Sequence, residues 1–263
     1  MNRTLLLLIA FYLTTVFMAN AQTDAVLQAF QAATFTNESG FELPYRILRP
    51  DSYDVHGDDN YPLVLFLHGA GERGSDNAAQ LVHGAERLLA NQQIEPAIIL
   101  APQCAEGDYW AQMEKEENGE RRFNFDEVPN PSMAAVIELL DFVLAEEQID
   151  HQRVYIMGLS MGGMGTFELL ARKPDTFAAA IPICGGTNPA LLSIFAEKVP
   201  LWIFHGADDA VVDVKYSRQV VDALKALGHP ARYTEYPGVN HNSWDNAFAE
   251  PDLLSWLMSH QKN

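Results

Sequence analysis

Basic residues are scarce in this sequence. It contains 17 lysines and arginines against 35 aspartates and glutamates, which gives a formal net charge of −18 at pH 7. Proteins that bind nucleic acid or anionic membranes neutralise phosphate groups with lysine and arginine, so this acidity argues against both kinds of partner. The same charge predicts solubility and a poor attraction for polyanionic substrates.

Long apolar runs are scarce too, and the one run that resembles a membrane segment lies at the start of the chain. Residues 5–13 are apolar, follow Arg3, and precede an Ala-x-Ala motif that ends at Ala21. This order is typical of a secretory signal peptide. The alternative is an uncleaved anchor, for which the run is short. We expect cleavage after Ala21 (residues 1–21 removed), a single domain at 22–263, and a secreted or periplasmic protein that is not bound to a membrane.

Signatures of cofactor sites are missing. The sequence has no glycine-rich phosphate loop and no dinucleotide-binding fingerprint. Asp208, Asp209 and Asp213 are spaced somewhat like a calcium loop. However, no glycine occupies the turn and no glutamate closes the loop at the required distance. We therefore predict neither a cofactor nor a metal.

Buried strands alternate with helical patterns along the chain. Continuous apolar runs are typical of strands buried on both faces of a parallel sheet, and they occur at 62–67, 97–102, 154–157, 177–183 and 200–204. More polar strands are predicted at 41–48 and 232–236, helices at 78–92, 131–144, 161–170, 214–227 and 250–260, and a short helix near 189–196. Residues 22–36 look like a weakly amphipathic lead-in. This alternation predicts an α/β fold with a mostly parallel, doubly wound sheet of about eight strands.

Residues 105–130 interrupt this alternation. They contain Trp110 and a highly charged run, and Asn118-Gly119 favours a tight turn between two short strands. We expect an excursion with a small hairpin near the active site, with a solvated loop of no special role as the alternative.

The stretch from Gly158 to Gly162 carries the strongest chemical signal. A β-branched and aromatic run precedes it and a helical pattern follows, so Ser160 lies at the apex of a strand–turn–helix. Gly-x-Ser-x-Gly in this setting is typical of a nucleophile elbow. We expect a strained serine backbone, and glycines whose side chains would otherwise collide with the neighbouring strand and helix. The plain alternative is a glycine-rich turn with an exposed serine.

A serine nucleophile needs a general base and a carboxylate that orients the base. Four histidines follow Ser160 along the chain: His205, His229, His241 and His260. His241 lies in the loop after the last predicted strand, where strand ends face a ligand crevice, so it is the predicted base. Asp213 is a predicted helix N-cap. Spacing alone does not separate Asp208 from Asp209 as the acid.

Four blocks of sequence together resemble a known family. Residues 67–74, 158–163, 205–212 and 240–245 are similar to the predicted-peptidase group of α/β-hydrolases, relatives of polyhydroxybutyrate-depolymerase-like, feruloyl and acetyl esterases. The resemblance extends from about residue 40 to 258. It implies the α/β-hydrolase fold and Asp209 as the acid. The position after the acid is often proline in relatives and is alanine here.

Backbone N–H groups should form the oxyanion hole. One belongs to Met161, the residue after the nucleophile, and the resemblance implies that Ala70 supplies the other. His68 is expected to hold this loop in place, and Glu72 and Arg73 to form an internal pair.

Two tryptophans on loops at the catalytic end are candidate substrate contacts. Trp110 could equally line the substrate site or pack beneath the loops, whereas packing is favoured for Trp244.

The two cysteines, Cys104 and Cys184, could form one disulfide. The strand order implied by the resemblance, 1-2-4-3-5-6-7-8, places them after strands 4 and 6. Three strand spacings separate them by about 14 Å, whereas a disulfide needs Cα atoms within about 7 Å. We predict two free thiols.

The sequence thus predicts a serine hydrolase that cleaves carboxylic esters through an acyl-enzyme. Family analogy and export favour a small ester or an ester-decorated polysaccharide as substrate, with acetyl or feruloyl groups. A serine peptidase with the same triad is the first alternative. A non-catalytic binding protein with the hydrolase fold is the second.

Overall fold

The computed structural model describes residues 24–262. The predicted signal peptide at 1–21 lies outside this range. Among the described residues, none of the helices has both the length and the apolar character that a membrane span requires.

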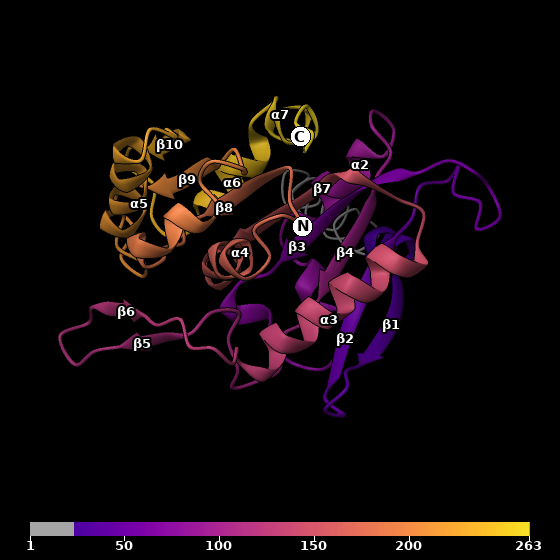
Figure 1. Ribbon diagram of the computed structural model, residues 1–263, viewed down its shortest axis with the longest axis horizontal. Helices are drawn as coiled ribbons and strands as arrows, with labels where there is room; N and C mark the ends of the chain where they lie inside the picture. Colours follow the sequence, from indigo (N-terminus) through magenta and orange to yellow (C-terminus); the bar gives the residue numbers. More distant parts are fainter. Residues whose placement is uncertain (1–23, 263) are drawn as a thin grey trace, which may run out of the picture.

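A central sheet of eight strands organises the molecule (Figure 1). Its spatial order is β1-β2-β4-β3-β7-β8-β9-β10, which matches the order implied by the resemblance. β1 and β4 are each antiparallel to β2, and the other neighbouring pairs are parallel. The strands are β1 (Gln31–Thr36), β2 (Glu42–Leu48), β3 (Tyr61–Leu67), β4 (Ile98–Pro102), β7 (Ile149–Leu159), β8 (Ala179–Ile183), β9 (Trp202–Gly206) and β10 (Arg232–Tyr236). The prediction of an α/β-hydrolase fold is confirmed.

Helices cover both faces of this sheet. They are α2 (Ala85–Asn91), α3 (Pro131–Glu146), α4 (Met161–Arg172), α5 (Lys215–Ala226), α6 (Ser243–Ala249) and α7 (Leu253–Met258), with short 3₁₀ segments η1 (Ala70–Glu72), η2 (Ala79–Leu81) and η3 (Pro189–Ile194). Residues of α3, α4 and α5 pack on one face, and residues of α2, α6 and α7 pack on the other.

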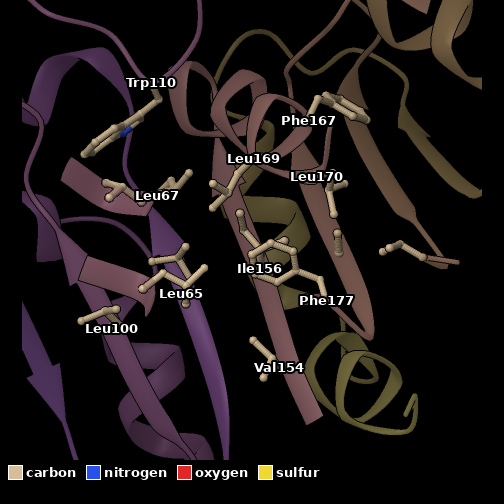
Figure 2. Packing of buried hydrophobic residues seen from close by; sticks show 14 of the residues in the cluster. Leu65, Leu67, Leu100, Trp110, Val154, Ile156, Phe167, Leu169, Leu170 and Phe177 are labelled. Carbon is tan, nitrogen blue, oxygen red and sulfur yellow. The ribbon is translucent and has the colours of Figure 1, made fainter. Parts of the chain in front are cut away.

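The central strands are apolar throughout because both of their faces are covered. Every residue of β3 is buried. Leu65 and Leu67 join the cluster beneath α3 and α4, where Figure 2 shows them, whereas Val64 and Phe66 join the cluster on the opposite face. This alternation follows from the two-residue period of a strand.

Three predicted elements differ from the structure. The lead-in at 22–36 contains the edge strand β1, most of whose side chains are exposed. The helix predicted at 78–92 begins only at Ala85, because Gly84 has a left-handed backbone that interrupts it. The closing helix predicted at 250–260 is shorter and forms α7, and a further helix, α6, precedes it and ends before Pro251.

The excursion at 105–130 contains the predicted hairpin, formed by β5 (Met113–Lys115) and β6 (Arg121–Phe123). It extends from the body beneath α5 (Figure 1). Arg172 anchors its base, because the guanidinium pairs with the buried Glu168 and donates to the carbonyl of Asp126. Nearer the tip, the Arg121 N–H donates to the Tyr216 hydroxyl of α5 at 2.6 Å. The hairpin is thus attached to both α4 and α5.

Both cysteines are free, as predicted, and both are buried. Cys104 follows β4 and Cys184 follows β8, so β3 and β7 lie between them in the sheet.

Candidate active site

Ser160 occupies a sharp turn between β7 and α4. Its backbone has a φ of +53°, a left-handed conformation that is costly for a residue with a side chain. The turn fits only because its flanking residues are glycines. A Cβ at Gly158 would lie 2.3 Å from the Gly162 carbonyl oxygen, and one at Gly162 would lie 1.9 Å from the Leu67 carbonyl oxygen. The turn therefore has the elbow geometry predicted from the sequence.

Ser160, His241 and Asp209 form a continuous chain of hydrogen bonds. The Ser160 hydroxyl lies 2.9 Å from Nε2 of His241. Nδ1 of the same ring lies 2.7 Å from Oδ2 of Asp209. Because a carboxylate only accepts hydrogen bonds, Nδ1 carries the proton and Nε2 is free to accept one from the serine. The structure thus brings together the three residues that the sequence singled out for catalysis.

Asp209 is surrounded by hydrogen-bond donors. Its Oδ1 accepts from the N–H groups of Val211 and Val212, and its Oδ2 also lies 3.2 Å from Nε2 of His205. Burial alone would disfavour the charge. The bonds from His205, His241 and the two backbone N–H groups outweigh burial, so the pKa of the Asp209 carboxyl lies well below its usual range. The carboxylate therefore stays ionised beside His241.

Asp208, the alternative acid, is exposed. Its N–H donates to the Val239 carbonyl at 3.0 Å. Asp208 therefore helps to hold the backbone of the loop after β9, called the acid loop here, and does not orient the imidazole of His241.

Two residues to which the sequence assigned no role support the loop that carries Asp209. Oδ1 of Asn240 accepts from the N–H of Ala210 at 2.9 Å and from the N–H of His241 at 2.7 Å. His205 is fully buried, and its Nδ1 lies 2.7 Å from the Ser217 hydroxyl. Its Nε2 faces the carbonyl of Val212 as well as Asp209, so this nitrogen carries the ring proton. In the sequence, the only indication of a role for His205 is that it begins the block 205–212 that resembles the family.

The loop after β3 lies beside the elbow. Ala70 is the first residue of η1 and Met161 is the first residue of α4. Both N–H groups thus belong to the first turn of a helix, where no preceding carbonyl of that helix is available to accept them. This placement is compatible with the predicted oxyanion hole.

His68 ties this loop to the sheet. Its Nδ1 donates to the Gly69 carbonyl at 2.6 Å, and its Nε2 accepts from the Cys104 N–H at 2.9 Å. Both ring nitrogens of a neutral imidazole are therefore satisfied. Burial, with a smaller contribution from the charge of Arg73, lowers the pKa of His68 to about 4.

This pKa predicts a loss of stability in acid. The unfolded chain protonates the histidine below a pH of about 6.5, whereas folded His68 does so only near its lowered pKa. As the pH falls through this window, the free energy of unfolding is expected to decrease by about 3 kcal/mol from this residue alone. Urea unfolding at pH 7 and pH 4 measures the decrease. His68→Gln keeps a donor and an acceptor but cannot titrate. Between pH 7 and pH 4, the free energy of unfolding of this variant should therefore decrease by about 3 kcal/mol less than that of the wild type. An equal decrease in both proteins would contradict the prediction.

For Trp110 the structure favours one of the two roles that the sequence left open. Its side chain is completely buried, so it does not form an exposed wall of the substrate site. Nε1 donates to the His68 carbonyl at 3.1 Å, and Figure 2 shows the ring within the apolar cluster above Leu67. Packing beneath the loop is therefore its role. Trp244 is only partly buried and its ring stands edge-on to His241, with centroids 5.4 Å apart.

The expected Glu72–Arg73 pair is wrong. Arg73 donates to the carbonyls of Ala70 and Asp108, while the Glu72 carboxylate faces His83 at 3.6 Å. The two side chains thus point away from each other, and Arg73 still bonds to Ala70 in the loop after β3.

Among the residues that the structure describes, one group of side chains has metal-ligating types close together. Cys184, Asp209 and His241 each place a potential ligand atom within 4.8 Å of the others. Burial raises the pKa of the Cys184 thiol to about 12, so this sulfur keeps its proton at neutral pH. Asp209 and His241 already bond to each other, so the site is not suited to hold a metal.

The sheet order, the strained serine elbow and the adjoining histidine and acid loops define an α/β-hydrolase. Residues 55–252 match the family described as Phospholipase/Carboxylesterase, and the chain belongs to this family.

Similar proteins include several esterases. A solved structure of a thermostable esterase is 37% identical with a TM-score of 0.80, over 90% of this chain and 64% of that one. The bifunctional acetylxylan esterase/xylanase of Neocallimastix patriciarum is 37% identical over 90 residues, which make up 34% of this chain and 13% of that protein. Acyl-protein thioesterase 1 of Neurospora crassa is 27% identical over 68% of this chain and 80% of its own length. This chain therefore spans only a small part of the xylanase-containing relative.

Proposed function

We propose that this protein is a serine hydrolase of carboxylic esters. The observation that carries the proposal is the hydrogen-bond chain from Ser160 through His241 to Asp209, with the serine on a strained elbow. This arrangement provides a nucleophile, a base within reach of its proton, and a carboxylate that holds the base in the required tautomer.

The reaction proceeds in two halves. The Ser160 hydroxyl attacks the ester carbonyl while His241 Nε2 takes its proton. The N–H groups of Ala70 and Met161 stabilise the oxyanion, and each such donor contributes about 3 kcal/mol to the transition state. His241 then protonates the leaving alcohol, which departs from the acyl-enzyme. Water, deprotonated by the same imidazole, releases the acid and restores the serine.

The proposed substrates are acetyl or feruloyl esters carried by a polysaccharide. The similarity to an acetylxylan esterase/xylanase supports this choice. The signal-peptide pattern at residues 1–21 supports it as well, because such a pattern predicts export to a compartment where polysaccharides are found. The similarity to an acyl-protein thioesterase favours a second candidate, the hydrolysis of thioesters by the same residues.

Initial rates on five substrates test the proposal: p-nitrophenyl acetate, p-nitrophenyl octanoate, methyl ferulate, an acyl thioester and a peptide anilide. We expect turnover of the esters, a faster rate on acetate or ferulate than on octanoate, and no cleavage of the anilide. Ser160 should also be labelled covalently by a fluorophosphonate.

Each other outcome points to a different function. Cleavage of the anilide alone would indicate a peptidase, and a preference for the thioester would favour the second candidate. A folded protein that hydrolyses nothing and resists the fluorophosphonate would be a non-catalytic binding protein.

A further inference from the structure

A row of side chains outside the catalytic chain borders His241 on one side. The ring of Trp244 stands perpendicular to the His241 ring, at an interplanar angle of 86°. The His83 ring lies 5.2 Å from the Trp244 ring, and the Glu72 carboxylate follows, 3.6 Å from Nε2 of His83. Because Glu72 ends η1, this row connects the histidine loop to the loop that carries Ala70.

The backbone fixes His83 in this row. The next residue, Gly84, has a φ of +82°, and a Cβ there would lie 2.2 Å from the Phe248 ring. Glycine suits both restrictions, so the backbone turn directly after His83 is well defined before α2 begins. The side chains remain accessible, because His83 is 34% exposed and Glu72 is 15% exposed. The row is therefore partly open to solvent.

The chemistry of the row suits a neutral molecule with several hydroxyl groups. An indole offers an apolar surface for the C–H face of a sugar ring. A carboxylate accepts hydrogen bonds from hydroxyl groups, and an imidazole both donates and accepts. Glu72 would repel an anionic group, and the net charge of −18 acts in the same direction.

The position of the row assigns it to the alcohol side of the ester. In the proposed reaction the oxyanion faces the N–H groups of Ala70 and Met161, while the leaving oxygen must reach Nε2 of His241. The group attached to that oxygen therefore extends past His241, along Trp244. A separate apolar cluster that includes Met164 and Val212 borders the nucleophile helix and the acid loop.

We propose that Trp244, His83 and Glu72 form the subsite for the leaving alcohol, and that this alcohol is a neutral sugar residue. The inference rests on the proposed ester hydrolysis and adds to it the residues that would bind the sugar.

Two substrates with the same acyl group test this subsite: an acetylated xylo-oligosaccharide and ethyl acetate. The measured quantity is the ratio of kcat/KM for the sugar ester to kcat/KM for ethyl acetate. His83→Ala should lower this ratio about tenfold, because a sugar hydroxyl loses its partner. His151→Ala, which removes an exposed histidine on β7, is the matched control and should leave the ratio unchanged.

A second measurement keeps the test informative if His83→Ala folds poorly. The deacetylated oligosaccharide should inhibit ethyl acetate hydrolysis competitively, and Glu72→Gln should raise its inhibition constant. Equal losses on both esters, or an inhibition constant that no variant changes, would overturn the subsite and leave the esterase proposal standing. If wild type hydrolysed neither ester, the proposed function itself would fail.

Discussion

Ser160→Ala is expected to lower kcat/KM for p-nitrophenyl acetate by about 10⁴- to 10⁶-fold. The reason is geometric, because the Ser160 hydroxyl is the group that bonds to Nε2 of His241 at the apex of the elbow. The oxyanion loop would remain, so some acceleration over water should persist. Assays of p-nitrophenyl acetate hydrolysis measure the decrease in kcat/KM, and fluorophosphonate labelling should be lost in the same variant.

Two aspartate variants provide a matched control for this result. Asp209→Asn should lower kcat/KM by about 10⁴-fold, because an amide in place of the carboxylate favours the wrong tautomer of His241. Asp208→Asn, one position earlier and exposed, should change it by no more than about twofold. Comparable losses in the two variants, or an active Ser160→Ala protein, would contradict the proposed triad.

The parts of the site that the sequence predicts correctly are those whose chemistry demands a local pattern. The elbow needs glycines at 158 and 162 because any Cβ there would meet backbone atoms, and this requirement is visible in five consecutive residues. His241 could be selected because it follows the last strand of the sheet. The order of the strands also came from local blocks, through their resemblance to a family.

The parts that the sequence does not predict depend on contacts between loops that are distant along the chain. Asn240, in the loop after β10, bonds to Ala210, in the loop after β9, and His83 approaches Trp244 from a segment about 160 positions earlier. Neither contact leaves a pattern near its own residue. Trp110 illustrates the same limit, because a tryptophan on a loop looks identical whether its ring lines a site or packs beneath it.

Gly162→Ala is expected to lower the free energy of unfolding by about 4 kcal/mol, near the upper end for a single added methyl group. Its Cβ would lie 1.9 Å from the Leu67 carbonyl oxygen and 2.8 Å from the His68 carbonyl oxygen. These are backbone atoms of β3 and of the loop that follows it, so no side chain can rotate away to make room. Either β3 or the start of α4 must move.

This movement should also reduce activity in the protein that still folds. Gly162 is two residues from Ser160, and a displacement of about 1 Å at a reacting group can reduce the rate about 100-fold. Urea unfolding and ester hydrolysis on the same preparation measure both effects. Gly71→Ala is the control for stability, because nothing lies within 4 Å of its added Cβ and its φ is not positive. If Gly162→Ala were as stable as Gly71→Ala, the close approach of α4 to β3 would not be what holds the elbow in place.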